Sequence, residues 1–290
     1  MKVVITGAAG FVGRWAVKAF EEAGHQVTGF DLDGSDVDVD LTELRDTHLA
    51  LTVAKPEAIV HLAALAGSTG KGGGSESMKT PFMFLDKNPR MALNVYETCK
   101  TLGIRKVVCM SSFSVYGKAT CPIDEDTPLN PNTPYGASKV CVEAVARIYA
   151  EAYGINSVIF RVPLICGEGQ KELNALREMV MAAKSDKPLE VWGDGSTLRE
   201  WVHPSDVARA YLSALGPMYR PCETFVLGNY PLSMDVLAKM IIENVGKGEI
   251  KYLQEKPKLF DQFTDHSRVL GLGWKPQIGT EEIVQRVIKA

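Results

Sequence analysis

Tyr135 and Lys139 have the side chains and the spacing that could move a proton. They stand four residues apart and fall on one face of the helix predicted over residues 135–153. A free tyrosine has a pKa of about 10 and is a poor base at neutral pH, but a nearby ammonium favours the phenolate and lowers that pKa. Because such pairs are common on protein surfaces, this interpretation needs a second observation.

Two serines supply that second observation. Ser111 and Ser112 come directly after the predicted strand 106–110. The carboxyl ends of parallel strands border the ligand crevice of an open α/β sheet. A hydroxyl at this edge could hydrogen-bond the substrate oxygen whose proton Tyr135 accepts or donates.

A glycine-rich turn near the start of the chain predicts a dinucleotide site. Gly7, Gly10 and Gly13 lie between a β-branched run at residues 2–6 and a helical pattern at residues 14–24. Glycines let backbone N–H groups approach a pyrophosphate, and the helix N-terminus favours its negative charge. A glycine turn without this strand and helix would be weak evidence.

Asp31 ends the next predicted strand, residues 25–30. An acid about 20 residues beyond the glycines can accept hydrogen bonds from the ribose hydroxyls. The same charge would repel a 2′-phosphate, so NAD is favoured over NADP. The alternative is an ordinary loop aspartate in the acidic run 31–36, but the register of strand, glycines and acid favours the ribose.

The composition excludes several classes of partner. Of 290 residues, 46% are hydrophobic, and 32 basic against 35 acidic residues leave a net charge of −3. We expect no nucleic-acid partner, since the chain has no excess of basic residues. We expect no membrane association, since no apolar run approaches about 18 residues. The first strand starts at once, with no signal peptide before it, which favours the cytoplasm. The six cysteines are scattered, which favours reduced thiols over a disulfide framework or a metal site.

Strands and helices alternate up to about residue 161, which predicts right-handed crossovers and a doubly wound parallel sheet. Further along the chain, strands and helices no longer alternate regularly, and we expect a smaller second lobe. The expected division is an NAD-binding domain of 1–162, to which roughly 200–227 return, and a substrate lobe of roughly 163–199 and 228–290. The expected strands are 2–6, 25–30, 58–62, 106–110, 157–161 and 223–227; the expected helices are 14–24, 41–54, 88–102, 135–153, 172–184, 205–215 and 234–244.

The Gly-, Ser- and Lys-rich stretch 67–77 is either a lid over the site or a surface connection.

These features together resemble the NAD-dependent epimerase/dehydratase family, the extended branch of the short-chain dehydrogenases/reductases. The resemblance covers nearly the whole chain and is specific as an ordered set. It rests on the glycine turn, Asp31, Asp40-Leu41, His61-Leu62-Ala63-Ala64, Ser111-Ser112, Val115-Tyr116-Gly117, Tyr135-x-x-x-Lys139, Gly193-Asp194-Gly195 and Arg199-Glu200-Trp201-Val202-His203.

The resemblance implies a Rossmann-type fold with a C-terminal α/β substrate lobe, NAD as cofactor, and a homodimer formed through the Tyr135 helix and its neighbour. Tyr135 would be the acid/base, Lys139 would hold the nicotinamide ribose and tune Tyr135, and Ser112 would be the hydroxyl partner. The cofactor-binding residues would be Gly7, Gly10, Phe11, Val12, Asp31, Asp40 (at the adenine), Leu41, Leu62, Ala63, Ala64, Asn88, Ser111, Tyr135, Lys139 and Val162, and the substrate-binding residues Ser112, Tyr135, Leu164 and Arg199.

Departures from the family pattern bear on the substrate. Phe113 and Ser114 stand where the family's dehydratases carry an Asp-Glu pair, which argues against a 4,6-dehydratase; Ser114 also replaces the cysteine of the GDP-sugar reductase/epimerases. Leu164 replaces a frequent substrate-binding asparagine. Arg199 matches the arginine that grips the nucleotide diphosphate, but residues 251–263 offer only lysines where a second arginine is often found.

Three functions stay open from the sequence. The first is a UDP-sugar 4-epimerase-like reaction, in which hydride passes transiently to bound NAD. The second is a dehydrogenase of a sugar or small hydroxy compound, from which NADH departs. The third is a non-catalytic NAD-binding protein, which the presence of Ser112, Tyr135 and Lys139 disfavours. His61, His203, Trp192, Trp201 and Trp274 are interpreted as packing residues.

Overall fold

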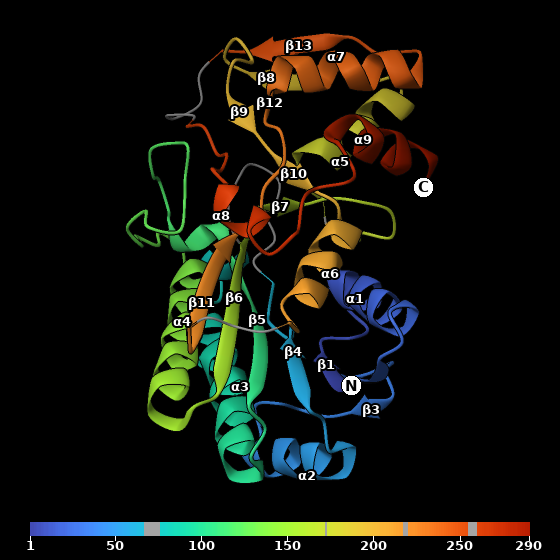
Figure 1. Cartoon of the computed structure of the whole chain (residues 1–290). Coiled ribbons are helices and arrows are strands. Elements are labelled where there is room, and N and C mark those ends of the chain that lie inside the picture. Colours follow the sequence, from blue (N-terminus) through green and yellow to red (C-terminus); the bar gives the residue numbers. More distant parts are fainter. Residues whose placement is uncertain (67–75, 172, 217–219, 255–259) are drawn as a thin grey trace.

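The computed structural model describes residues 1–66, 76–171, 173–216, 220–254 and 260–290. Its centre is a seven-stranded, wholly parallel sheet in the order β11-β6-β5-β4-β1-β2-β3 (Figure 1). The order reverses direction between β1 and β4, which creates the crevice where ligands bind in doubly wound sheets. The strands are β1 (Lys2–Thr6), β2 (Gln26–Asp31), β3 (Val37–Asp38), β4 (Ala58–His61), β5 (Lys106–Ser112), β6 (Asn156–Val162) and β11 (Cys222–Val226).

Helices cover both faces of this sheet (Figure 1). On one face α1 (Phe11–Glu22) packs against α6 (Pro204–Ser213). On the other face α3 (Pro81–Leu102) lies between α2 (Leu44–Ala54) and α4 (Pro134–Tyr153). The predicted doubly wound α/β fold is therefore confirmed.

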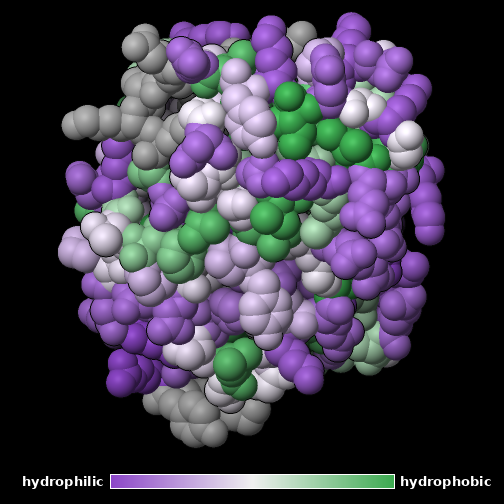
Figure 2. Space-filling model, turned by 90° about the horizontal axis from the view of Figure 1, so that it is seen from above, coloured by the Kyte–Doolittle hydropathy of each residue, from purple (hydrophilic) through white to green (hydrophobic). Residues whose placement is uncertain are grey.

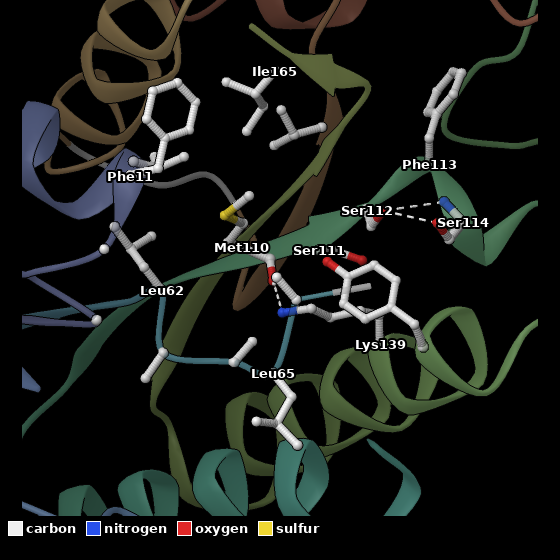
Figure 3. Close-up of a pocket in the computed structure, with 18 of the residues that line it drawn as sticks. Phe11, Leu62, Leu65, Met110, Ser111, Ser112, Phe113, Ser114, Lys139 and Ile165 are labelled. Carbon is white, nitrogen blue, oxygen red and sulfur yellow. Dashed lines mark hydrogen bonds between the residues drawn. The ribbon is translucent and has the colours of Figure 1, made fainter. Parts of the chain in front are cut away.

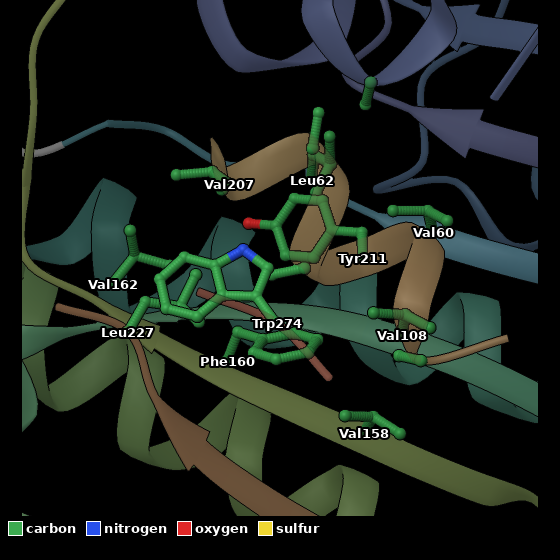
Figure 4. Close-up of a cluster of buried hydrophobic side chains, with 14 of the residues drawn as sticks. Val60, Leu62, Val108, Val158, Phe160, Val162, Val207, Tyr211, Leu227 and Trp274 are labelled. Carbon is green, nitrogen blue, oxygen red and sulfur yellow. The ribbon is translucent and has the colours of Figure 1, made fainter. Parts of the chain in front are cut away.

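The core under α1 and α6 is built from alternating strand residues. Val60, Val108 and Phe160 project from the central strands against the fully buried ring of Tyr211 (Figure 4). Trp274, from near the C-terminus, packs on the same cluster and donates its indole N–H to the carbonyl oxygen of Asp206 at 2.8 Å. This contact ties the end of the chain to the sheet.

A smaller group of elements lies beyond the carboxyl ends of the strands. Its core joins α5 (Ala175–Lys184), α7 (Met234–Val245) and α9 (Thr280–Lys289). Strand β8 (Leu189–Trp192) pairs with β13 (Ile250–Leu253) in parallel. The outer face of this group shows mainly hydrophilic side chains, with apolar ones among them (Figure 2). The remaining short elements are β7 (Leu164–Ile165), β9 (Leu198–Arg199), β10 (Trp201–Val202), β12 (Leu232–Ser233), α8 (Ser267–Leu270) and the 3-10 helices η1 (Glu76–Met78) and η2 (Phe113–Val115).

The helices expected from residues 14 and 172 begin at Phe11 and Ala175, and two other predicted starts were wrong for identifiable reasons. The helix expected from residue 41 begins at Leu44, because the carboxylate of Asp40 accepts hydrogen bonds from Thr42 N and Oγ1 and forms a turn instead. The helix expected from residue 88 begins at Pro81 and continues through Pro89 without ending there. Residues 67–75 of the predicted loop 67–77, and residue 172 at the start of another predicted helix, lie outside the described residues.

Within the described residues, no helix combines the length and the apolar character needed to cross a membrane.

Candidate active site

One cavity of about 900 Å³ lies at the carboxyl ends of the central strands, where they meet the smaller group of elements (Figure 3). Its wall brings together most of the residues singled out in the sequence. These are Gly7, Gly10, Phe11, Val12, Gly13, Asp31, Asp40, Leu41, Leu62, Ala63, Ala64, Ser111, Ser112, Tyr135, Lys139, Val162 and Leu164.

The glycine turn is packed so tightly that side chains are excluded. Gly7 has φ of +73°, and a Cβ there would come within 2.8 Å of the backbone nitrogen of Ala63. A Cβ at Gly13 would overlap the carbonyl oxygen of Gly7. Among the described residues no side chain caps the N-terminus of α1, so its first N–H groups are available to a ligand. This arrangement suits a phosphate group.

Asp31 stands at the tip of β2 and also braces the glycine turn. Its Oδ2 accepts a hydrogen bond from Ala9 N at 3.0 Å, and its Oδ1 accepts one from Leu32 N at 2.8 Å. Each carboxylate oxygen has a further lone pair that a ribose hydroxyl could use. Asp40 borders the same end of the cavity, where hydrogen bonds from Thr42 hold the pKa of its carboxyl below the usual value.

Tyr135 stands in the first turn of α4, whose start is defined by two local contacts. Pro134 occupies the first helical position, and the hydroxyl of Thr133 accepts a hydrogen bond from Gly136 N at 3.0 Å. The ring of Phe84 meets the Tyr135 ring edge-on, with centroids 6.3 Å apart. These contacts orient the phenol into the cavity.

Lys139 lies one turn further along α4, and its ammonium donates to the carbonyl oxygen of Met110 at 3.0 Å (Figure 3). It is 5.8 Å from the centroid of the Tyr135 ring. Burial raises the pKa of Tyr135 to about 12 and lowers the pKa of Lys139 to about 8. Both shifts have one main cause, because burial away from solvent favours the neutral form of each group.

The two serines at the end of β5 have different partners. The hydroxyl of Ser112 donates to Ser114 Oγ at 3.2 Å, and its proximity to Tyr135 opposes the rise in the pKa of that phenol. Ser111 lines the cavity, but its hydroxyl donates to the buried carboxylate of Glu143 at 2.6 Å. Of the two serines, Ser112 is therefore the one whose hydroxyl is not bound to Glu143.

A buried ion pair behind the site was missed from the sequence. Arg161 on β6 donates from Nε and Nη2 to the two carboxylate oxygens of Glu143 on α4, at 2.9 and 2.8 Å. Arg161 is 3% exposed and Glu143 is fully buried. Nη1 of Arg161 also donates to the hydroxyl of Tyr116 at 2.8 Å. The signal was available, because an arginine inside an otherwise apolar strand requires a buried partner.

Two predicted residues are absent from the described wall of the cavity. Asn88 lies beneath it, where its Oδ1 accepts from Leu65 N at 2.7 Å and its Nδ2 donates to Ser138 Oγ at 3.0 Å. Asn88 thereby joins the loop after β4 to α4. Arg199 uses Nη1 to bond the carbonyl oxygens of Leu198 and Phe260, at 2.8 and 2.6 Å.

The far end of the cavity is bordered by apolar and polar groups from several elements. Phe113, Leu164 and Phe260 form apolar surfaces there. Glu200, not singled out in the sequence, is 1% exposed, and burial raises its pKa to about 8. Its Oε2 accepts from Thr264, while its Oε1 has no hydrogen-bond partner in the described chain. Lys118 was also missed and lines this end.

The histidines and tryptophans have structural partners. His61 bonds Thr6 Oγ1 at 2.9 Å, and its complete burial lowers its pKa to about 3. His203 caps α6 and bonds Glu168 at 2.8 Å. Trp201 and Trp274 are buried. Within the described residues, no group of three or more His, Cys, Asp or Glu side chains is arranged to hold a metal ion.

The fold and this cavity are those of a dinucleotide-dependent enzyme. The chain belongs to the NAD dependent epimerase/dehydratase family, whose model matches residues 3–228. The predicted family is thus confirmed, and its description agrees with the cofactor expected from the glycine turn and Asp31.

The relatives it resembles are sugar-nucleotide enzymes. The chain is 26% identical to a UDP-glucuronate 4-epimerase of Thermodesulfobacterium geofontis, covering 98% of this chain and 94% of the relative. It is 29% identical to a UDP-glucose 4-epimerase of Mycolicibacterium smegmatis, covering 100% and 98%. Among solved structures, MoeE5 in complex with UDP-glucuronic acid and NAD superposes with a TM-score of 0.86 at 25% identity, covering 100% of this chain and 98% of MoeE5.

Proposed function

We propose that this protein is an NAD-dependent 4-epimerase of UDP-sugars. The observation that carries the proposal is the convergence of Tyr135, Ser112 and Lys139 with the glycine turn on one cavity. This places a proton-transfer group and a phosphate-binding backbone within one ligand site. The named activities of the relatives, which match nearly the full length of this chain, support UDP-sugars as the substrate class.

The residues fit the cofactor. The N–H groups at the start of α1 would hold its pyrophosphate, the carboxylate of Asp31 its ribose hydroxyls, and Lys139 the nicotinamide ribose. Bound NAD supplies hydride acceptance and return at the sugar carbon. The proposal therefore assigns the cofactor residues to the end of the cavity nearest β1 and β2.

The remaining chemistry is proton transfer by the protein. Tyr135 would take the proton of the sugar hydroxyl as its carbon is oxidised, and would return it on reduction. Ser112 would hydrogen-bond the same oxygen and hold it against the phenol. Reduction from the opposite face of the sugar inverts the carbon, which is epimerisation. The sugar must therefore turn beside Tyr135 between the two transfers.

A dehydrogenase remains the second candidate, and one observation favours it. Leu164 and the absence of a second arginine at residues 251–263 weaken the hold on a nucleotide sugar. Incubation with UDP-, GDP- and dTDP-hexoses, with and without added NAD, separates the two. An isomerised UDP-sugar without net NADH supports the epimerase, whereas NADH formed in proportion to product supports the dehydrogenase.

We also propose a homodimer formed through α3 and α4, in a cytoplasmic protein. The two helices pack side by side, and apolar side chains remain exposed on them: Phe82 at 77%, Leu93 at 44% and Ile148 at 57%. Such residues suit a subunit interface. Light scattering on the purified protein tests the dimer, and a monomer at micromolar concentration would contradict it.

The division into an NAD-binding domain and a substrate lobe is part of the same proposal. The pairing of β11 with β6 and the contact of α6 with α1 support the return of roughly 200–227 to the first domain.

A further inference from the structure

Lys118 is held by a tight turn at the far end of the cavity. It follows Gly117, which has φ of +61° and whose Cβ, if present, would overlap the carbonyl oxygen of Asn130. The N–H of Asn130 donates to the carbonyl oxygen of Val115 at 3.0 Å. The backbone before Lys118 is therefore tightly constrained, while its side chain is exposed and lines the cavity.

The ammonium of Lys118 shares an aromatic neighbour, Phe260, with a second cation. Its Nζ is 5.9 Å from the centroid of the Phe260 ring, and the guanidinium of Arg199 is 5.8 Å from the same centroid. Arg199 is anchored through Nη1 by two backbone carbonyls and does not line the described cavity. Lys118 does line it, so Lys118 is the cation that a ligand at this end meets directly.

The charge of Lys118 is not neutralised by any acidic residue in the described part of the chain. It forms no ion pair with the acidic residues that the structure describes. Among the described residues, its Nζ contacts the face of an aromatic ring, which attracts a cation but leaves all three ammonium donors for an anion. A lysine binds phosphate as a compact point charge.

We propose that Lys118 binds the diphosphate of the sugar nucleotide, with Arg199 behind Phe260 adding positive charge. The assignment rests on the proposed function, because it requires a nucleoside diphosphate at this end of the cavity. It accounts for the lack of a second arginine in residues 251–263: the cation comes from the loop after η2 instead. It also places the diphosphate beyond Ser112 and Phe113, so that the sugar lies toward Tyr135.

Titration calorimetry on the NAD-loaded protein tests this assignment with UDP and uridine as probes. Lys118→Gln should weaken UDP binding about tenfold and leave uridine binding unchanged, because only UDP carries the diphosphate. Lys118→Arg should restore most of the affinity. Lys247→Gln, which removes an exposed lysine away from the cavity, should bind UDP as the wild type does.

The remaining outcomes separate this assignment from the proposed function. Equal affinity of wild type and Lys118→Gln for UDP would overturn the role of Lys118 and leave the epimerase proposal standing. A loss confined to UDP-glucuronate would move Lys118 to a sugar carboxylate and equally overturn the diphosphate contact. If the wild type binds no nucleoside diphosphate, including GDP and dTDP, the sugar-nucleotide proposal fails and the Lys118 assignment falls with it.

Discussion

Gly136 lies so close to Ser114 that a side chain at Gly136 would overlap the carbonyl oxygen of Ser114. This contact lets the first turn of α4 pack directly on η2, which follows β5. It brings Tyr135, the residue before the glycine, to the hydroxyl of Ser112 at the end of the strand. The Tyr-Gly pair is therefore a geometric requirement of the site as well as a sequence motif.

Replacing the phenol tests the acid/base role. Tyr135→Phe removes the only oxygen of the side chain but keeps the ring that packs against Phe84. We expect NAD binding to persist and kcat with a UDP-hexose to fall at least about 10²-fold, because proton transfer from the sugar hydroxyl loses its base. Steady-state kinetics with fluorescence titration of NAD measure both. Unchanged turnover in Tyr135→Phe would contradict the acid/base role.

Removing the ammonium should change the pH dependence of the rate. In Lys139→Met the phenolate of Tyr135 loses its nearby positive charge, so its pKa rises and the increase of kcat with pH moves to higher pH. At pH 7 we expect a loss of about 10²-fold. Since burial lowers the pKa of Lys139 to about 8, the wild type also loses this charge above that pH, and its advantage over the variant should shrink there. Parallel pH–rate profiles for the two proteins would contradict this role.

Asp31 is expected to select the cofactor and to brace its binding turn. Asp31→Asn removes the charge that repels a 2′-phosphate. The new amide has a single carbonyl oxygen, so it can accept a hydrogen bond from the backbone N–H of Ala9 or of Leu32 but not hold both as the carboxylate does. We expect NAD affinity to fall about tenfold and the preference for NAD over NADP to narrow. Titration with both cofactors measures the ratio. Asp33→Asn, two residues along the same acidic run, is the matched control and should leave the preference as it is.

The ion pair behind the site should control stability. Arg161→Met leaves the buried carboxylate of Glu143 without its bidentate partner, and we expect a loss of about 3 kcal/mol in the free energy of unfolding at pH 7. Arg161 helps to hold the pKa of Glu143 below its usual value, so the pair stabilises the fold above that value and the stabilisation disappears as the pH falls. The deficit of the variant should therefore shrink in acid, as measured by urea unfolding at several pH values.

Arg147→Met serves as the comparison for this pair. Arg147 contacts the same carboxylate, but its side chain is 39% exposed, so its loss should cost less than about 1 kcal/mol. Equal losses in the two variants would show that burial of Arg161 does not set the energy of the pair.

Much of the fold could be predicted from local patterns in the chain. The β-branched runs and glycine-ended helices identified the parallel sheet, because buried strands and amphipathic helices have distinct periods. The helix starts predicted at residues 41 and 88 were wrong, because a side-chain turn at Asp40 and the packing of a proline-containing helix depend on their surroundings.

The sequence by itself determined which groups could do chemistry: the phenol, the ammonium, the hydroxyl and the glycine turn, each marked by a short motif. Only the tertiary structure decided which of them share the cavity. It turned Ser111 toward Glu143, placed Asn88 beneath the wall and Arg199 behind Phe260, and brought Glu200 and Lys118 to the far end. The physical reason is that a motif specifies local backbone geometry, whereas the direction of a side chain depends on partners that are distant in the chain.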